Sequence, residues 1–339
     1  MRAEDFFKLP DGRTAHIYRM RLADGFGIDV SDWGATVISL YTADRDGNLR
    51  DVALGWKEPS DYYENSIYFG STVGRIPNRI KDGKFTFDGV DYQFVINDMG
   101  SSTLHGGFGY SHRLWELEYA SDECLVLSLS SPHGDGGFPG ALEIKITFAL
   151  GADHSVRMTV NAVADRPCPA DFTNHTYFNL NGGKSDKCRN HFIRIAADKY
   201  TETDRFLVPT GNLTDVAGTV YDLRKERAFE EIFASRPRGM DDNFILGYEN
   251  NLWKENVAEC RSAESGIKLS VSTDSPGVQF YMGDCLENLN GKSGICHDGD
   301  GFCLETQNWP DAVNNPDFPT VCRSAGESVW QTVWSFGIC

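Results

Sequence analysis

The stretch "ALEIKITFALGADHSVRMTVNAVA", residues 141–164, decides the fold. Apolar and polar side chains alternate along both of its halves, which is typical of β-strands that bury one face. The segment "GADH" interrupts the alternation with residues that favour a turn. The stretch therefore predicts two antiparallel strands joined by a short connection.

The same alternation recurs along the chain, for example in "TAHIYRMRLA", "KFTFDGVDYQFVI", "IKLSVSTD" and "ESVWQTVWSF". Asp88 and Gly89 lie between two alternating segments and give the strongest short-range signal for a β-hairpin. Helical periodicity is limited to "ERAFEEIFAS", residues 226–235. We find no repeat of fixed period and no low-complexity linker. The sequence predicts an all-β protein, one large antiparallel β-sandwich, with residues 1–339 as a single domain.

Composition excludes several classes of function. The chain has 32 Lys and Arg against 49 Asp and Glu, a formal net charge of −17 that disfavours binding to nucleic acid or to an anionic membrane surface. The 9 cysteines show no C-x-x-C spacing, and no H-E-x-x-H or dinucleotide-binding G-x-G-x-x-G motif occurs. We therefore expect no metal and no cofactor. The odd number of cysteines and the absence of an apolar leader or spanning segment favour a cytoplasmic protein.

Four polar side chains in the second half of the chain each lie on the more polar face of an expected strand. At a period of two residues, His175 in "ADFTNHTYFNL", Asp241 in "GMDDNFIL", Gln279 in "GVQFYMG" and Glu305 in "GFCLETQN" lie on the more polar face, with Asp242 among apolar residues. If these faces belong to one concave sheet surface, the four side chains converge.

Such a surface suits a sugar. Carboxylates, an amide and an imidazole can bind hydroxyl groups, and aromatic rings such as Tyr177, Tyr281 and Trp309 can pack against the apolar face of a pyranose. A histidine and a carboxylate are also a competent acid/base pair near neutral pH. Alone, His175 would more often be a structural histidine than a catalyst.

At these residues the sequence resembles the aldose 1-epimerases, or galactose mutarotases. The resemblance spans nearly the whole chain and is carried, in order, by "GRIPNRI" (74–80), "LHGG" followed by "LWE" (104–116), "NHTYFNL" (174–180), "MDDNF" (240–244), "PGVQFY" (276–281) and "ETQNWPDAVN" (305–314). It implies a galactose mutarotase-like supersandwich with the sugar in a cleft on one sheet and no requirement for metal or cofactor.

The resemblance also implies roles for individual residues. His175 is expected to be the general acid and Glu305 the general base. Residues that hold the sugar would be Asn78, Arg79, His105, Asp241 and Gln279. The expected reaction is exchange between the α and β anomers of a free hexose, D-galactose and also D-glucose, by opening and reclosure of the ring.

Two alternatives stay open on the sequence. An epimerase for a hexose 6-phosphate would need extra cations, and the candidates are Arg75, Arg79, Lys81 and Lys84. A sugar-binding or sensor protein without turnover would need no acid/base pair. The sequence does not distinguish a monomer from a homodimer, and it assigns Cys285, Cys296 and Cys303 to packing.

Overall fold

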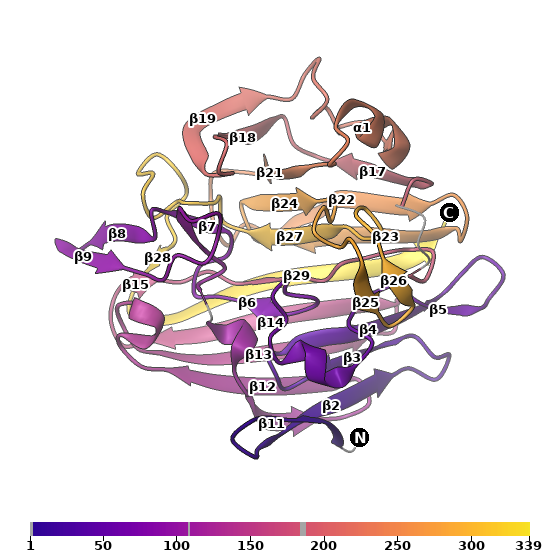
Figure 1. Cartoon of the computed structure of the whole chain (residues 1–339), viewed down its shortest axis with the longest axis horizontal. Helices are drawn as coiled ribbons and strands as arrows, with labels where there is room; N and C mark the ends of the chain where they lie inside the picture. Colours follow the sequence, from indigo (N-terminus) through magenta and orange to yellow (C-terminus); the bar gives the residue numbers. More distant parts are fainter. Residues whose placement is uncertain (1–2, 108, 184–187) are drawn as a thin grey trace.

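Strands dominate the fold, as the sequence predicts. The computed structural model describes residues 3–107, 109–183 and 188–339. Every strand pair among these residues is antiparallel, and the only α-helix in them is α1, Phe229–Ser235, within the stretch of helical periodicity (Figure 1). No helix in the described ranges has the length and apolar character needed to cross a membrane. The all-β prediction is confirmed.

The largest sheet has nine strands and contains the hairpin predicted for residues 141–164. Its strands, in spatial order, are β11 (Glu116–Ala120), β12 (Cys124–Ser131), β13 (Leu142–Gly151), β14 (Ser155–Ala164), β29 (Gly326–Ile338), β23 (Ile267–Thr273), β22 (Lys254–Ser262), β17 (His191–Ile195) and β20 (Arg227–Ala228). In β13 the apolar residues are buried, whereas Glu143 and Lys145 are exposed. One face of β13 therefore packs into the core.

Two five-stranded sheets accompany the large one. The first comprises β1 (Glu4–Lys8), β2 (Thr14–Arg21), β3 (Gly27–Ser31), β4 (Thr36–Ala43) and β5 (Leu49–Asp51). The second has the spatial order β19 (Pro209–Asp215), β18 (Lys199–Thr203), β21 (Asp241–Ile245), β24 (Gly277–Tyr281) and β27 (Cys303–Gln307). This second sheet carries three of the four polar groups that the sequence predicts to converge.

Short strand pairs and turns complete the fold. The pairs are β6 (Thr72–Val73) with β16 (Thr173–Asn174), β7 (Arg79–Lys81) with β10 (Ser102–Leu104), β8 (Lys84–Phe87) with β9 (Val90–Gln93), β15 (Cys168–Pro169) with β28 (Cys322–Arg323), and β25 (Leu289–Gly291) with β26 (Gly294–Cys296). The 3-10 helices are η1 (Pro59–Tyr62), η2 (Tyr110–His112) and η3 (Asp135–Gly137). Asp88 and Gly89 join β8 to β9 with positive φ at both positions, so the predicted hairpin is confirmed.

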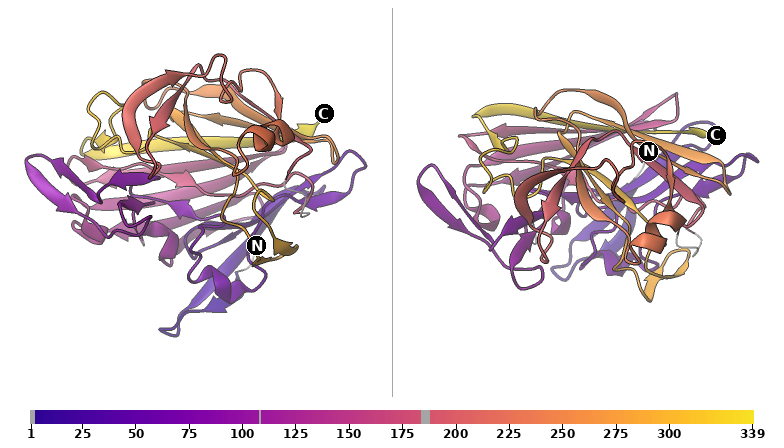
Figure 2. Two further views of the ribbon diagram at one scale, coloured as in Figure 1. Left: turned by 45° about the horizontal axis from the view of Figure 1, so that its top comes forward. Right: turned by 90° about the horizontal axis from the view of Figure 1, so that it is seen from above.

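Figures 1 and 2 show how the sheets are arranged, and the main buried apolar cluster contains side chains from the nine-stranded sheet and from both five-stranded sheets. Val278 and Phe280 of β24 belong to the same buried apolar cluster as Val160 and Trp334 of the large sheet. Successive side chains of a strand point to opposite faces. The alternate residues of β21, β24 and β27 are thereby directed away from the main core, toward the opposite side of their sheet.

The segment around His175 differs from the long strand that its alternation suggests. Of residues 170–180, only Thr173–Asn174 form a strand, and the whole segment is buried. Its later backbone groups bond to two other parts of the chain, because Phe178 pairs with Phe302 and Asn179 donates to Val52. Buried backbone N–H and C=O groups need hydrogen-bond partners, and in this segment the partners belong to several neighbouring segments instead of one adjacent strand.

Candidate active site

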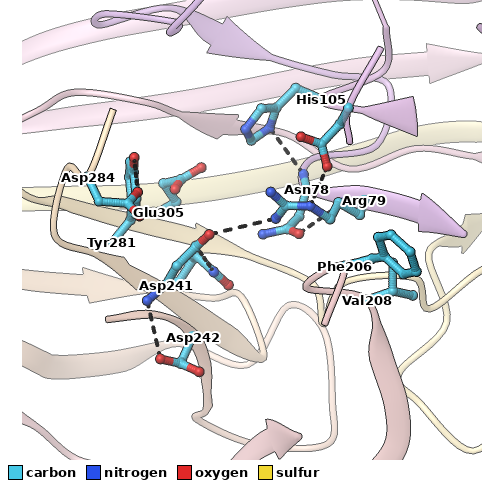
Figure 3. A network of polar contacts seen from close by, with 12 residues as sticks. Asn78, Arg79, His105, Phe206, Val208, Asp241, Asp242, Tyr281, Asp284 and Glu305 are labelled. Carbon is cyan, nitrogen blue, oxygen red and sulfur yellow. Dashed lines mark hydrogen bonds and ion pairs between the residues drawn. The ribbon is translucent and has the colours of Figure 1, made fainter. Parts of the chain in front are cut away.

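A cleft of about 500 Å³ opens beside β21, β24 and β27. Its lining includes six of the seven residues that the resemblance singles out, namely Asn78, Arg79, His105, His175, Asp241 and Glu305. Figure 3 shows the polar network around this space, with His105 and Asn78 on one side and Asp241 and Glu305 on the other. Three of the four polar groups predicted to converge, His175, Asp241 and Glu305, therefore line one cleft, and the six lining residues come from five separate segments of the chain.

His175 and Glu305 form the innermost pair. Nε2 of His175 lies 3.6 Å from Oε1 of Glu305, and both side chains are buried. The backbone of His175 is fixed on both sides, since its N–H donates to the carbonyl of Ser71 and its carbonyl accepts from the N–H of Gly70. Oε2 of Glu305 has no hydrogen-bond partner among the described residues. A buried carboxylate oxygen without a partner in the protein can accept a hydrogen bond from a ligand hydroxyl.

Burial sets the charge state of this pair. It lowers the pKa of His175 to about 4 and raises the pKa of Glu305 well above its ordinary value. The negative charge of Asp241 also raises the pKa of Glu305, and Arg79 opposes both effects. Near neutral pH the two groups therefore hold one proton between them, because either a second proton or the loss of the first would leave net charge in a buried site.

Asn78 and His105 hold each other in place. They lie at the adjoining ends of β7 and β10, and both have positive φ. The N–H of His105 donates to the carbonyl of Asn78, and the N–H of Asn78 donates to Nδ1 of His105 at 3.1 Å. Because Nδ1 accepts a backbone proton, the neutral ring must carry its own proton on Nε2. Burial lowers the pKa of His105 well below its ordinary value, so the ring is a neutral donor.

Arg79, Asp241 and Gln279 form a second connected group. Nε of Arg79 donates to Asp98 at 2.8 Å, and NH1 lies 3.8 Å from Oδ2 of Asp241. The other oxygen of Asp241 accepts from Nε2 of Gln279 at 2.6 Å. Burial raises the pKa of Asp241, and the charge of Arg79 counteracts this shift. The carboxylate is therefore held in one orientation from two sides.

The ligand atoms of His105, His175 and Glu305 lie within 4.8 Å of one another, which is close enough for all three to reach one metal ion. The hydrogen bond from Asn78 to Nδ1 argues against it, because a metal on Nε2 of His105 would require the proton to move to Nδ1. With its proton on Nε2, His105 can donate to an oxygen atom of a ligand. The chemistry of the three groups fits a polyhydroxylated molecule better than a cation.

Two sequence expectations are corrected by the structure, and a third, sugar binding by Gln279, stays a proposal. Gln279 is absent from the cleft lining, and its amide donates to Asp241. Trp309 is buried in a separate apolar cluster, where its indole N–H donates to the carbonyl of Pro276. Arg75, proposed as a cation for a phosphate, is buried against the backbone carbonyls of residues 131, 139 and 140. Alternation predicts on which face of a strand a side chain lies, but it does not predict whether that side chain reaches a cleft.

Other cleft residues were not identified from the sequence. Tyr68 lies in the lining with its ring 6.0 Å from that of His175 and 4.7 Å from that of His105, measured between centroids. Asp284 accepts a hydrogen bond from Tyr281 at 2.9 Å and pairs with Arg238. Both Tyr68 and Asp284 lie in connections between strands, outside the alternating segments, where no periodic pattern indicates the direction of a side chain.

A family profile, related sequences and solved structures all point to the same protein family. The profile of the aldose 1-epimerase family matches residues 16–334. The chain is 41% identical to the galactose mutarotase of Rattus norvegicus, over 97% of this chain and 96% of the relative. It is 34% identical to the aldose 1-epimerase of Escherichia coli, over 91% of each. An aldose epimerase homologue from C. elegans superposes with a TM-score of 0.87 at 27% identity, covering 96% of this chain and 99% of that one.

Proposed function

The chain belongs to the aldose 1-epimerase family and is an isomerase that interconverts the anomers of a sugar, and from this premise we propose which residues perform the reaction and on which sugar. His175 is the general acid and Glu305 the general base. The observation that carries the assignment is the 3.6 Å separation of Nε2 and Oε1 in a buried pair on the wall of the cleft. Two groups so close can serve the ring oxygen and the anomeric hydroxyl of one pyranose.

The pKa shifts favour the shared proton on Glu305 in the sugar-free pair, so the reaction begins once that proton has moved to His175 and left Glu305 ionised. Glu305 removes the proton of the anomeric hydroxyl while Nε2 of His175 protonates the ring oxygen, and the bond between C1 and O5 breaks. The product is an open-chain aldehyde with a hydroxyl at C5. Rotation about the bond between C1 and C2 presents the other face of the carbonyl. Protonated Glu305 then donates to the carbonyl oxygen, His175 removes the C5 hydroxyl proton, and the ring closes as the opposite anomer.

This cycle uses one proton in two positions. In the closed-ring complex that reacts, the proton is on His175, and in the open-chain complex it is on Glu305. The total is the single proton that burial favours for the pair near neutral pH. Neither step therefore changes the net charge of the buried site, and no proton has to be exchanged with solvent during turnover.

The remaining polar groups hold the sugar and stabilise charge on its oxygens. His105 donates from Nε2, and Arg79 and Asp241 offer a donor and an acceptor in fixed orientation. Asn78 supplies an amide beside them. Gln279 acts through Asp241, since its Nε2 donates to that carboxylate. Tyr68 and Tyr281 supply aromatic surface at the cleft.

We propose D-galactose and D-glucose as substrates, which agrees with the names of the mutarotase relatives. Three of the four arginines in the lining, Arg79, Arg236 and Arg238, are paired with carboxylates of the protein. A phosphate group would have to compete for these cations, which disfavours a hexose 6-phosphate. The presence of a buried acid/base pair disfavours a binding protein without turnover, because binding alone does not need one.

Three further expectations stay proposals. We propose that residues 1–339 form one domain, since one apolar cluster contains residues from Tyr18 to Phe336. A cytoplasmic location is supported by the nine cysteines, all of which are free thiols. A monomer and a homodimer are both compatible with the site, because all of the groups in the proposed mechanism come from one chain.

Polarimetry of freshly dissolved α-D-galactose tests the assignment. We expect the wild-type protein to accelerate the approach to anomeric equilibrium, and His175→Asn and Glu305→Gln each to lose at least about 100-fold in kcat. Cys260→Ala, a buried substitution in β22, is the control for purification and handling. Retention of most of the rate by either variant would show that the proton is transferred by another group.

A further inference from the structure

Cys303 and Glu305 lie on the same face of β27, two residues apart, and His175 sits between them. Side chains at this spacing on a strand are separated by about 7 Å, which is enough to accommodate an imidazole ring with a contact at each nitrogen. Nε2 of His175 faces Oε1 of Glu305 at 3.6 Å, and Nδ1 faces Sγ of Cys303 at 3.5 Å. The thiol is fully buried.

The proposed chemistry requires a particular tautomer of His175. When the imidazolium donates the proton on Nε2 to the ring oxygen, the neutral ring must keep its proton on Nδ1. Only then is the lone pair of Nε2 available to take a proton back during ring closure. An acceptor beside Nδ1 favours that tautomer, and the side chain beside Nδ1 is Cys303.

We propose that Cys303 is a positioning residue that accepts a hydrogen bond from Nδ1–H of His175 and thereby keeps Nε2 as the atom that exchanges protons in the cleft. This inference rests on the proposed acid role of His175. It assigns a role to a residue that the sequence attributes only to packing.

Sulfur suits this position better than a carboxylate does. Burial raises the pKa of the Cys303 thiol well above its ordinary value, so the group is neutral and a weak acceptor. A carboxylate beside Nδ1 would stabilise the imidazolium and raise the pKa of the ring, making it a weaker acid toward the sugar. A neutral thiol orients the ring without adding a third negative charge beside Glu305 and Asp241.

Neighbouring groups fix the ring plane but do not by themselves select the tautomer. The rings of Tyr177 and His105 lie 4.9 and 5.1 Å from that of His175, between centroids. The backbone carbonyl of His175 is a second possible acceptor for the ring, although it already accepts from the N–H of Gly70. The test therefore has to separate the thiol from both the packing and this carbonyl.

The first measurement is the nitrogen NMR spectrum of sugar-free protein labelled with ¹⁵N in its histidine rings, with His175 identified by its loss in His175→Gln. We expect Nδ1 of His175 to be protonated in wild type and in Cys303→Ser, and a mixture of tautomers in Cys303→Ala. Serine and alanine remove similar volume, but only serine keeps an acceptor. A bare Nδ1 in wild type, or an unchanged tautomer in Cys303→Ala, would overturn the proposal.

Kinetics gives a second readout. We expect Cys303→Ala to lower kcat about five- to tenfold with KM within about twofold, and Cys303→Ser to keep a kcat about threefold above that of the alanine variant. Cys260→Ala, which also removes a buried thiol, should match wild type. Equal losses in the serine and alanine variants would assign Cys303 to packing and contradict the proposal. Failure of the acid assignment is distinguishable, because His175→Asn would then stay active whatever the tautomer.

Discussion

Nε2 of His175 lies 3.6 Å from Oε1 of Glu305, and both side chains are buried beneath the cleft. The pair can hold one proton at little electrostatic cost, but two protons or none leave net charge without solvent. Burial lowers the pKa of His175 to about 4, and it raises the pKa of Glu305 well above its usual range. The two pKa shifts determine the pH dependence that we expect for the enzyme.

We expect kcat/KM for D-galactose to be constant from about pH 5 to above neutrality, with the acid limb well below the ordinary histidine pKa of about 6.5. Acid adds the second proton to the pair, and the lowered pKa of His175 moves that event to lower pH. Alkali removes the only proton, and the raised pKa of Glu305 delays that loss. Polarimetry across the pH range measures both limbs.

Folding has to be monitored in the same experiment. A buried neutral histidine takes up a proton on unfolding at its ordinary pKa, so the contribution of His175 to stability falls as the pH drops below about 6.5. Circular dichroism at each pH separates unfolding from loss of catalysis. An acid limb near pH 6.5 in protein that is still folded would mean that the ring is solvated in the working enzyme.

The adjacent residues Asp241 and Asp242 provide a matched pair of substitutions. Asp241 faces the cleft and contacts Arg79 and Gln279, whereas Asp242 faces the other side of β21 and pairs with Arg236 at 3.3 Å. We expect Asp241→Asn to raise KM for D-galactose about tenfold or more, because a charged acceptor becomes neutral. Asp242→Asn should leave KM within about twofold. Equal effects on KM would contradict the assignment of sugar binding to one face of β21.

Substitution of Gln279 tests whether this residue acts on the sugar through Asp241. It lies opposite Glu305 in the ladder between β24 and β27, and its amide donates to Asp241. Gln279→Glu places a third carboxylate beside these two, so we expect kcat/KM to fall by about 100-fold or more. Gln279→Met, which is neutral and of similar length, should lose about tenfold. If both variants lose equally, the amide is needed for itself and not for the charge balance around Asp241.

The sequence predicts the fold and six residues that line the candidate cleft, and the reasons are visible in particular residues. Alternation in β13 and β14 predicts both strands, because each buries one face. It also places Asp241 and Glu305 on the face of their strands that lines the cleft. It could not predict that Tyr68 contacts His175 or that Arg75 is buried, because turns and the short β6 and β7 region follow no period. Those positions depend on backbone contacts between distant segments, which one sequence does not reveal.

Substitution of Arg75 tests whether this buried arginine stabilises the fold instead of binding the sugar. Its guanidinium donates to the carbonyls of Pro139 and Gly140, to the hydroxyl of Ser131 and to Tyr110, all within buried surroundings. Arg75→Met would leave these acceptors without a donor, so we expect the free energy of unfolding to fall by about 2–5 kcal/mol. KM for D-galactose should change by less than about twofold in protein that is still folded, because Arg75 is absent from the cleft lining. Lys81→Ala, an exposed position from the same expected cluster, should alter stability by no more than about 0.5 kcal/mol. Urea denaturation measures both variants, and a stable Arg75→Met protein with a greatly raised KM would return this arginine to the sugar site.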